Sequence, residues 1–296
     1  MQDNRPGSLP IPEEPYYHSD PSAYAADCEK IGVIIPNAVN PAYPDMADKL
    51  KRAAQAAGLC ALVCNTDNSL RREADCLSVL LDANVSGIVA MPVCDESHEL
   101  YVESGSPVVL YGCRTPEESL GYIAMDDILA GRIAAERLTA QGHRRLAFLS
   151  YPARSYAVTD RLNGFSTVVR EKSAELMIAN VSGGRLQDSF SAMLALLESD
   201  SPPTAIAASD DFTAIGAWQA LREKQLPVGD GIVLLGFGNT PFAALPKHGL
   251  SSVGPVGEDQ AAITISALQA MQNGLCGMRS RILLTPKLVC RSTFRD

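Results

Sequence analysis

Two pairs of neighbouring carboxylates are the residues with the clearest potential for chemistry, Asp126-Asp127 and Asp210-Asp211. Successive residues project in different directions, so neither pair can by itself act as a general acid/base dyad. Each pair lies at the start of a segment with helical periodicity, 127–141 or 211–224, and Asp is a preferred helix N-cap. The pattern therefore predicts that one member of each pair caps a helix.

The motifs of common enzyme classes are absent. The sequence contains no GxxxxGK[ST] phosphate loop, no GxSxG elbow, no SxxK and no HExxH. Gly236-Phe237-Gly238 follows a predicted strand as a GxG, but Thr240-Pro241 stands where the third glycine and the helix of a dinucleotide site would begin. We therefore expect no catalytic constellation and no cofactor.

The eight cysteines form no ligand pattern. No CxxC occurs, Cys60 and Cys64 lie four apart on an apolar run, and only four histidines exist to complete a metal site. Scattered cysteines in a chain of this length without a secretion signal behave as small buried hydrophobes. We expect neither disulfides nor a metal site from the full set, Cys28, Cys60, Cys64, Cys76, Cys94, Cys113, Cys276 and Cys290.

Charge and hydropathy narrow the possible partners. The formal net charge is −9 and the sequence pI is about 5.0, which lacks the positive field that non-specific binding to phosphates requires. No apolar run approaches the roughly 20 residues that span a bilayer. Met1 does not lead into a basic and then apolar signal segment. These features predict a cytoplasmic protein with no membrane contact and no nucleic-acid affinity of its own.

The length and the hydrophobic pattern predict how these residues are positioned. At about 150 residues per domain, 296 residues correspond to two domains. Residues 1–29 contain Pro6, Pro10, Pro12, Pro15 and Pro21, and they read as an irregular, acidic, Pro-rich tail. From Ile31 onward, short apolar runs bounded by Gly or Pro alternate with helical segments, which is typical of a parallel sheet built from βαβ units.

The alternation occurs twice along the chain. The first round has predicted strands 31–35, 59–64, 87–91 and 107–111 and predicted helices 43–57, 69–83, 95–104 and 127–141, with a turn-rich stretch before the last helix. The second round has predicted strands 146–149, 176–181, 204–208 and 232–236 and predicted helices 157–173, 187–199 and 211–224. A helix at about 257–273 and strands at 281–284 and 287–291 follow.

The repetition predicts an α/β fold of two doubly wound parallel-sheet lobes with a ligand cleft between them. We assign residues 30–142 and about 254–276 to the N-terminal lobe. Residues 143–253 and about 277–296 are assigned to the C-terminal lobe. The chain would then cross between the lobes three times.

Several segments, in order, resemble those of a known family. They are IGVIIP at 31–36 followed by Asn40-Pro41, PVVL at 107–110, Asp126 with Gly131, GHRRLAF at 142–148, Arg161 with Gly164-Phe165, Asp210 with Ala214 and Gly216, LSSV at 250–253 and Arg291-Ser292-Thr293. Together, over residues 30–294, they resemble the effector-binding core of the LacI/GalR transcription regulators, whose fold is that of type I periplasmic binding proteins.

The resemblance implies a set of ligand contacts. Carried over residue by residue, these contacts are Tyr43, Asp126, Arg161, Ser209, Asp210, Phe237 and Asn239; Asp67 and Arg114 are added from their positions at strand ends. Planar polar groups and an aromatic face suit a sugar or a nucleoside. Each residue also has a structural alternative, since Tyr43 could pack in the core and both aspartates could serve as caps. Arg161 near a helix start would oppose the macrodipole, which favours its reading as a ligand contact.

The departures from the family pattern bear on the ligand. Ser209 replaces the usual Asn before Asp210, and Gly238 replaces a carboxylate that often contacts sugar. The second replacement argues against a standard hexose effector, unless Asn239 supplies a substitute acceptor. Nothing in residues 1–30 resembles the basic helix-turn-helix head of the family, so any DNA contact would come from a head outside this sequence.

The leading hypothesis is a cytoplasmic sensing domain of a LacI/GalR-like regulator, which binds a small sugar-like or nucleoside-like effector and switches conformation. The resemblance also implies a homodimer through the N-terminal lobe, including the predicted helix 43–57. The alternatives are the solute-binding protein of a sugar transporter, which would need an export signal, and an enzyme on the same scaffold, which would need a catalytic constellation.

Overall fold

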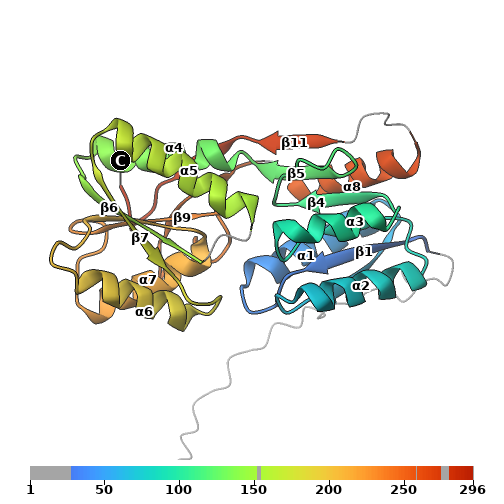
Figure 1. Cartoon of the computed structure of the whole chain (residues 1–296), viewed down its shortest axis with the longest axis horizontal. Helices are drawn as coiled ribbons and strands as arrows, with labels where there is room; N and C mark the ends of the chain where they lie inside the picture. Colours follow the sequence, from blue (N-terminus) through green and yellow to red (C-terminus); the bar gives the residue numbers. More distant parts are fainter. Residues whose placement is uncertain (1–27, 152–154, 258, 275–279, 296) are drawn as a thin grey trace, which may run out of the picture.

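The computed structural model describes residues 28–151, 155–257, 259–274 and 280–295, so the predicted tail falls almost entirely outside the described residues. Two six-stranded sheets, each covered by helices on both faces, form two lobes (Figure 1). This arrangement confirms the predicted α/β fold of two doubly wound lobes.

The first sheet has the strand order β11-β5-β4-β3-β1-β2, and every neighbouring pair in it is parallel. Its strands are β1 (Lys30–Ile35), β2 (Cys60–Asn65), β3 (Ile88–Ala90), β4 (Val108–Tyr111), β5 (Gly121–Met125) and β11 (Arg281–Leu284). Its helices are α1 (Ala42–Ala56), α2 (Leu70–Asp82), α3 (His98–Glu103) and α8 (Gln260–Gln272), with a short 3-10 turn, η2 (Asp95–Ser97), before α3.

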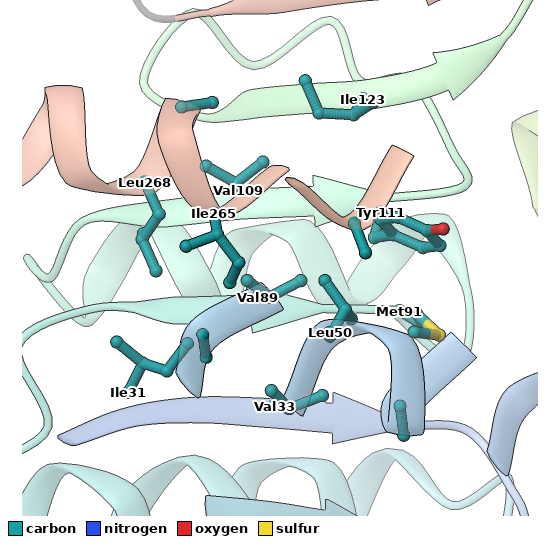
Figure 2. Packing of buried hydrophobic residues seen from close by; sticks show 14 of the residues in the cluster. Ile31, Val33, Leu50, Val89, Met91, Val109, Tyr111, Ile123, Ile265 and Leu268 are labelled. Atoms are coloured by element: carbon teal, nitrogen blue, oxygen red, sulfur yellow. The ribbon is translucent and has the colours of Figure 1, made fainter. Parts of the chain in front are cut away.

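The apolar runs of the first lobe form strands because both faces of the sheet are covered. Along β1, Val33 belongs to the core beneath α1 and α8, whereas Ile34 belongs to the core beneath α2 and α3. Figure 2 shows side chains from neighbouring strands packed against Leu50 of α1 and Ile265 of α8. These contacts hold the carboxyl ends of the strands in a fixed array.

The second sheet has the order β12-β10-β9-β8-β6-β7, and it is parallel except for β12, which runs antiparallel to β10. Its strands are β6 (Arg145–Ser150), β7 (Glu175–Asn180), β8 (Ala205–Ala208), β9 (Val233–Phe237), β10 (Ser251–Pro255) and β12 (Pro286–Val289). Helices α4 (Asp127–Ala140) and α5 (Tyr156–Glu171) cover one face, and α6 (Leu186–Leu197) and α7 (Asp211–Glu223) cover the other (Figure 1).

The chain passes between the lobes at three places, between β5 and α4, between β10 and α8, and between β11 and β12. Two elements lie in a different lobe from the one that we assigned from the sequence. The predicted N-terminal lobe included α4, but α4 packs on α5 and against the second sheet. The predicted C-terminal lobe included β11, but β11 pairs with β5 in the first sheet. The first crossing therefore follows Met125 rather than Gly142.

Most predicted elements are observed within about two residues of their expected ends, a normal spread for assigned boundaries. The sequence did not predict β5, which lies in the stretch that reads as turn-rich, or β10, whose Ser251-Ser252-Val253-Gly254-Pro255 has little β propensity. The two serines of β10 are nevertheless fully buried, because their hydroxyls bond to the Phe294 carbonyl and to Asp211. No helix among the described residues is long and apolar enough to cross a bilayer.

Candidate functional site

Arg161, on the second turn of α5, contacts the carboxyl ends of two strands and the start of a neighbouring helix. Its Nε donates to Asp127 Oδ1 at 2.7 Å, one of its terminal nitrogens donates to the Ser209 carbonyl at 2.7 Å, and its guanidinium lies 5.5 Å from the centre of the Phe237 ring. Only 13% of its side chain is exposed. Arg161 thus joins three separate strand ends or helix starts of the second lobe.

The close packing of α4 on α5 makes this contact possible. Gly131 of α4 and Gly164 of α5 meet so closely that a Cβ on either one would lie 2.0 Å from a carbonyl oxygen of the other helix. Because neither of these two positions carries a side chain, the start of α4 comes within reach of Arg161. The buried Asp127 carboxylate, which would be costly alone, is thereby paired with a cation.

In both Asp-Asp pairs the first aspartate caps a helix and the second is buried. Asp126 and Asp210 are the N-caps of α4 and α7, accepting backbone N–H groups at 2.9 and 2.7 Å respectively, which confirms that one member of each pair caps a helix. The second members, Asp127 and Asp211, are buried. Burial raises the pKa of each of them to about 6, and hydrogen bonds from their neighbours oppose this rise.

Asp211 is held by neutral donors. The Ser252 hydroxyl donates to one carboxylate oxygen at 2.6 Å, and the backbone N–H and hydroxyl of Thr240 donate to the other at 2.7 and 2.8 Å. The carboxylate therefore fixes the loop after β9 to strand β10. Asp211 faces the interior of the lobe and supports the loop that carries Asn239.

Asp210 connects to a half-buried tyrosine. The Tyr151 hydroxyl donates to Asp210 and accepts from the Thr213 hydroxyl at 2.7 Å. Burial and the Asp210 charge raise the pKa of Tyr151 well above its ordinary value, so it stays a neutral donor. Tyr151 gave no signal in the sequence as a site residue, because a Tyr that ends a strand is more often a packing residue.

Tyr43, near the start of α1, is a residue of the first lobe that lies near the Arg161 group. Burial raises its pKa to about 12, the Asp210 charge adds to the rise, and the Arg161 charge opposes it. Tyr43 also packs against the core beneath α1, so the packing and ligand readings are compatible. Its hydroxyl remains protonated at neutral pH, and it is near charged groups of the opposite lobe.

Arg114 joins the two lobes directly. After β4, its guanidinium forms a two-pronged ion pair with Asp160 of α5, at 2.5 Å from Nε and 2.9 Å from a terminal nitrogen, and it lies 4.8 Å above the Tyr156 ring. Asp95 accepts the Tyr156 backbone N–H at 2.9 Å. Sequence reasoning did not identify Asp95, Tyr156 or Asp160, since their partners come from the other lobe.

Phe237 and Ser209 line the inner side of this arrangement. Phe237 is 1% exposed at the end of β9, with its ring 6.2 Å from that of Phe148. Ser209 is fully buried, and it is the carbonyl of this residue that Arg161 binds. Both residues therefore position Arg161 through contacts within the second lobe.

Two of the expected ligand contacts are engaged by other groups of their own lobe. Asp67 pairs with Arg72 and accepts from the Asn65 amide at 2.8 Å, on an exposed turn after β2. Asn239, with a positive φ, accepts from Arg291 at 2.7 Å and donates its backbone N–H to Ser252 at 2.9 Å. The structure does not bring Asp67 together with the Arg161 group.

These contacts suit recognition of a polar molecule, with aromatic rings, a cation, carboxylates and a neutral phenol in one region. Among the residues that the structure describes, no group of three His, Cys, Asp or Glu side chains is arranged to hold a metal ion. The described cysteines are free thiols, and Cys276 lies outside the described residues.

Comparison with known proteins gives a consistent result. Residues 135–294, more than half of the chain, match the model of the periplasmic binding protein-like domain. The HTH-type transcriptional regulator DegA of Bacillus subtilis is 26% identical over 268 residues, which is 88% of this chain and 79% of that protein. The ribose operon repressor of Escherichia coli K12 is 25% identical over 272 residues, 89% of this chain and 81% of the repressor.

A solved structure shows the same fold. It is the periplasmic binding protein/LacI transcriptional regulator of Alkaliphilus metalliredigens complexed with D-xylulofuranose, with a TM-score of 0.79 at 23% identity over 90% of this chain and 100% of that chain. The resemblance that the sequence motifs indicated is therefore confirmed.

Proposed function

Because the chain belongs to the periplasmic binding protein-like domain family, we propose that it is the effector-sensing core of a LacI/GalR-type transcriptional regulator. In this proposal a small sugar-like or nucleoside-like molecule binds between the lobes, near Arg161. The bound molecule shifts an equilibrium between arrangements of the two lobes. The relatives named above are regulators, and one similar structure holds a sugar.

The observation that carries the proposal is that Tyr43 lies close enough to Arg161 and Asp210 for their charges to act on its hydroxyl. Tyr43 comes from the first lobe, and the other two come from helices of the second lobe. A ligand that contacts all three groups gains affinity only when the lobes are close. Differential affinity of this kind is what shifts a conformational equilibrium.

The Arg114–Asp160 ion pair supports the same switch. Its two hydrogen bonds cross from the first lobe to α5, and opening of the lobes would break both. Since Asp160 is 6% exposed, separation would leave a carboxylate to be solvated or paired again. The switch would therefore move between two discrete states.

Assembly and DNA contact belong to the proposal as well. We propose a homodimer formed through the first lobe, with DNA bound by a separate basic head, so that ligand-driven movement changes the spacing of two heads. Light scattering at several concentrations would measure the dimer. A mass equal to a single chain at every concentration would contradict it.

Ligand-induced stabilisation tests the sensing role. Pentoses, hexoses, sugar phosphates, nucleosides and purines would be screened by thermal unfolding, and a ligand at 100 times its dissociation constant should stabilise the protein by about 2.7 kcal/mol. Tyr43→Phe removes one hydroxyl at the proposed site and should weaken this response. Tyr122→Phe is the matched control, since Tyr122 lies on β5 beside Arg281 and outside the Arg161 group.

Two outcomes would contradict the proposal. In the first, none of these metabolites changes the unfolding midpoint of the protein. In the second, a ligand is found, but it binds the Tyr43→Phe and Tyr122→Phe variants with equal affinity. Asp210→Asn gives a further measurement, because the amide oxygen keeps the helix cap while the charge is lost.

A further inference from the structure

The first residue of α5, Tyr156, is held by three residues of the opposite lobe. Asp95 accepts its backbone N–H at 2.9 Å, the His98 ring stacks on its ring with the centres 6.1 Å apart, and the Arg114 guanidinium lies 4.8 Å from the ring centre. These partners come from η2, α3 and the end of β4 in the first lobe, whereas Tyr156 begins a helix of the second lobe. We propose that the four residues form a latch that holds the two lobes in the joined arrangement.

The backbone contact of the latch is a helix cap supplied from the other lobe. The N–H groups of the first helical turn have no partner within their own helix, so acceptors must come from elsewhere. Ser155 provides one for the Ala157 N–H at 3.3 Å, and Asp95 provides another for the Tyr156 N–H. A carboxylate at this position also interacts favourably with the helix dipole. Separation of the lobes would leave the Tyr156 N–H to water, while the Ser155 cap would remain.

The contacts of the Tyr156 ring attach the lobes in a second way. Aromatic stacking and a cation above an aromatic face are both favourable beyond the area that they bury. Arg114 contacts the Tyr156 ring while its guanidinium also pairs with Asp160, one turn further along α5. The first lobe therefore engages α5 at two successive turns, and opening of the lobes would break these contacts together.

A buried carboxylate fixes the first-lobe side of the latch. Glu73 of α2 is fully buried. It accepts the Val93 backbone N–H at 3.2 Å before η2, and it accepts the hydroxyls of Ser97 and Tyr101 at 2.7 and 2.5 Å. These neutral donors flank Asp95 along the chain, so the carboxylate sets the position of η2. Glu73 is thereby a positioning residue that acts on the second lobe through Asp95.

The latch has a consequence for the proposed sensing role, and that consequence rests on the proposed function. Arg161 lies on α5 five residues after Tyr156, so the latch holds the helix that carries the centre of the proposed ligand site. A ligand that binds the joined lobes has an apparent affinity that scales with the fraction of molecules already joined. Residues outside the site would therefore adjust ligand affinity through the equilibrium between lobe arrangements.

Small-angle X-ray scattering of the purified protein with no effector added tests the latch, because separation of the lobes increases the radius of gyration. Asp95→Ala removes the cap that comes from the other lobe, and Tyr156→Ala removes the ring, so both variants should have a larger radius than the unchanged protein. Ser155→Ala is the matched control, since it removes a cap from the same helix start but within the second lobe, and its radius should not change. Tyr156→Phe keeps the ring and the backbone N–H, and it should also match the unchanged protein.

Hydrogen exchange measures the latch at a single amide. Asp95→Ala should speed exchange of the Tyr156 N–H by about tenfold or more, the effect of losing a hydrogen bond to a charged group. Glu73→Gln should speed exchange of the same amide in the opposite lobe. Asp95→Asn, whose amide oxygen can still accept, should have a rate between those of the unchanged protein and Asp95→Ala. Glu103→Gln, at an exposed position of α3, is the control and should leave the rate unchanged.

Three results would overturn the latch. The first is an equal radius of gyration for the unchanged protein, Asp95→Ala and Tyr156→Ala. The second is an unchanged exchange rate of the Tyr156 N–H in Asp95→Ala, and the third is an equally large increase of the radius in Ser155→Ala. Because no effector takes part in these measurements, such a result would leave the sensing proposal standing, and a failed search for an effector would leave the latch standing.

Discussion

Helices α4 and α7 begin with the same dipeptide and cover opposite faces of the second sheet. In each, the first Asp caps the helix and the second is buried. Each helix also carries a glycine where it approaches its neighbour, Gly131 against α5 and Gly216 against α6. The two starts nevertheless stabilise their buried carboxylates differently.

At α4 the partner of Asp127 is the charged Arg161, whereas at α7 the partners of Asp211 are neutral hydroxyl and amide groups. At α4 the cation that pairs with the buried carboxylate is also the residue at the centre of the proposed ligand site. Neutral donors suffice where the carboxylate only holds a loop in place. The comparison separates a buried charge that takes part in the proposed switch from one that supports the local fold.

The largest effect is expected from Arg161→Ala, which leaves the Asp127 carboxylate buried without its cation. Removal of one partner from a buried ion pair costs about 3–5 kcal/mol. Urea unfolding would measure the decrease in the free energy of unfolding. Arg170→Ala, at an exposed position of the same helix, is the control. A loss below about 1 kcal/mol would mean that neutral groups also suffice at α4.

The next largest effect is expected from Gly131→Ala. It should lower the free energy of unfolding by about 3 kcal/mol, because the added Cβ would lie 2.0 Å from the Arg161 carbonyl oxygen. Gly216→Ala should lower the free energy of unfolding by less, about 1–2 kcal/mol, because its Cβ would lie 2.6 Å from the Ser189 Cβ and 2.7 Å from the Leu186 carbonyl oxygen, farther than the 2.0 Å contact at Gly131. Gly184→Ala, whose Cβ would meet nothing within 4 Å, is the control and should change little. Equal losses for Gly131→Ala and Gly216→Ala would show that the two helix pairs tolerate the methyl group alike.

The pH dependence of stability tests the neutral arrangement at α7. Asp211 has a pKa of about 6 in the folded protein, above its ordinary value of 3.8, so the folded state binds the proton more tightly. Its contribution to the free energy of unfolding is greatest below about pH 4 and falls by up to about 3 kcal/mol as the pH rises to 6. Urea unfolding of Asp211→Asn between pH 4 and 7 should lack this decline. An identical pH profile in the two proteins would contradict the assignment.

The smallest effects concern the caps. Asp126→Ala should lower the free energy of unfolding by about 1 kcal/mol, as for an ordinary cap. Asp210→Ala should lower it by about 2 kcal/mol, because the half-buried Tyr151 hydroxyl also loses its acceptor. Asp259→Ala at the cap of α8 supplies the reference value. If Asp210→Ala costs no more than Asp259→Ala, the tyrosine contact contributes nothing measurable.

Much of the fold was predictable because each buried strand is a short apolar run between breakers, as in Ile31 to Ile35 before Pro36. The strands β5 and β10 were missed for a physical reason. β5 follows a turn-rich stretch, and β10 is held by serine hydroxyls whose partners, Asp211 and the Phe294 carbonyl, are distant in sequence. The sequence also could not assign α4 to the correct lobe, because hydrophobic periodicity locates a helix but does not identify the sheet that the helix covers.

At the site, the sequence located strand ends but could not show which side chains turn toward the other lobe. Asp126 and Asp210 were identified by type and position, and both serve as caps. Burial of Asp127 beside Arg161 depends on the Gly131–Gly164 contact, which forms only in the folded protein. Asp67 was chosen by position alone, and Arg72, five residues further on, engages its carboxylate.

The three passages of the chain between the sheets have a consequence for cooperativity. Each sheet includes a strand that follows most of the other sheet in the sequence, since β11 completes the first and β12 the second. No single cut yields two contiguous pieces that each hold one whole sheet. Removal of the C-terminal segment that contains both β11 and β12 would weaken both sheets, so the two lobes should unfold as one unit.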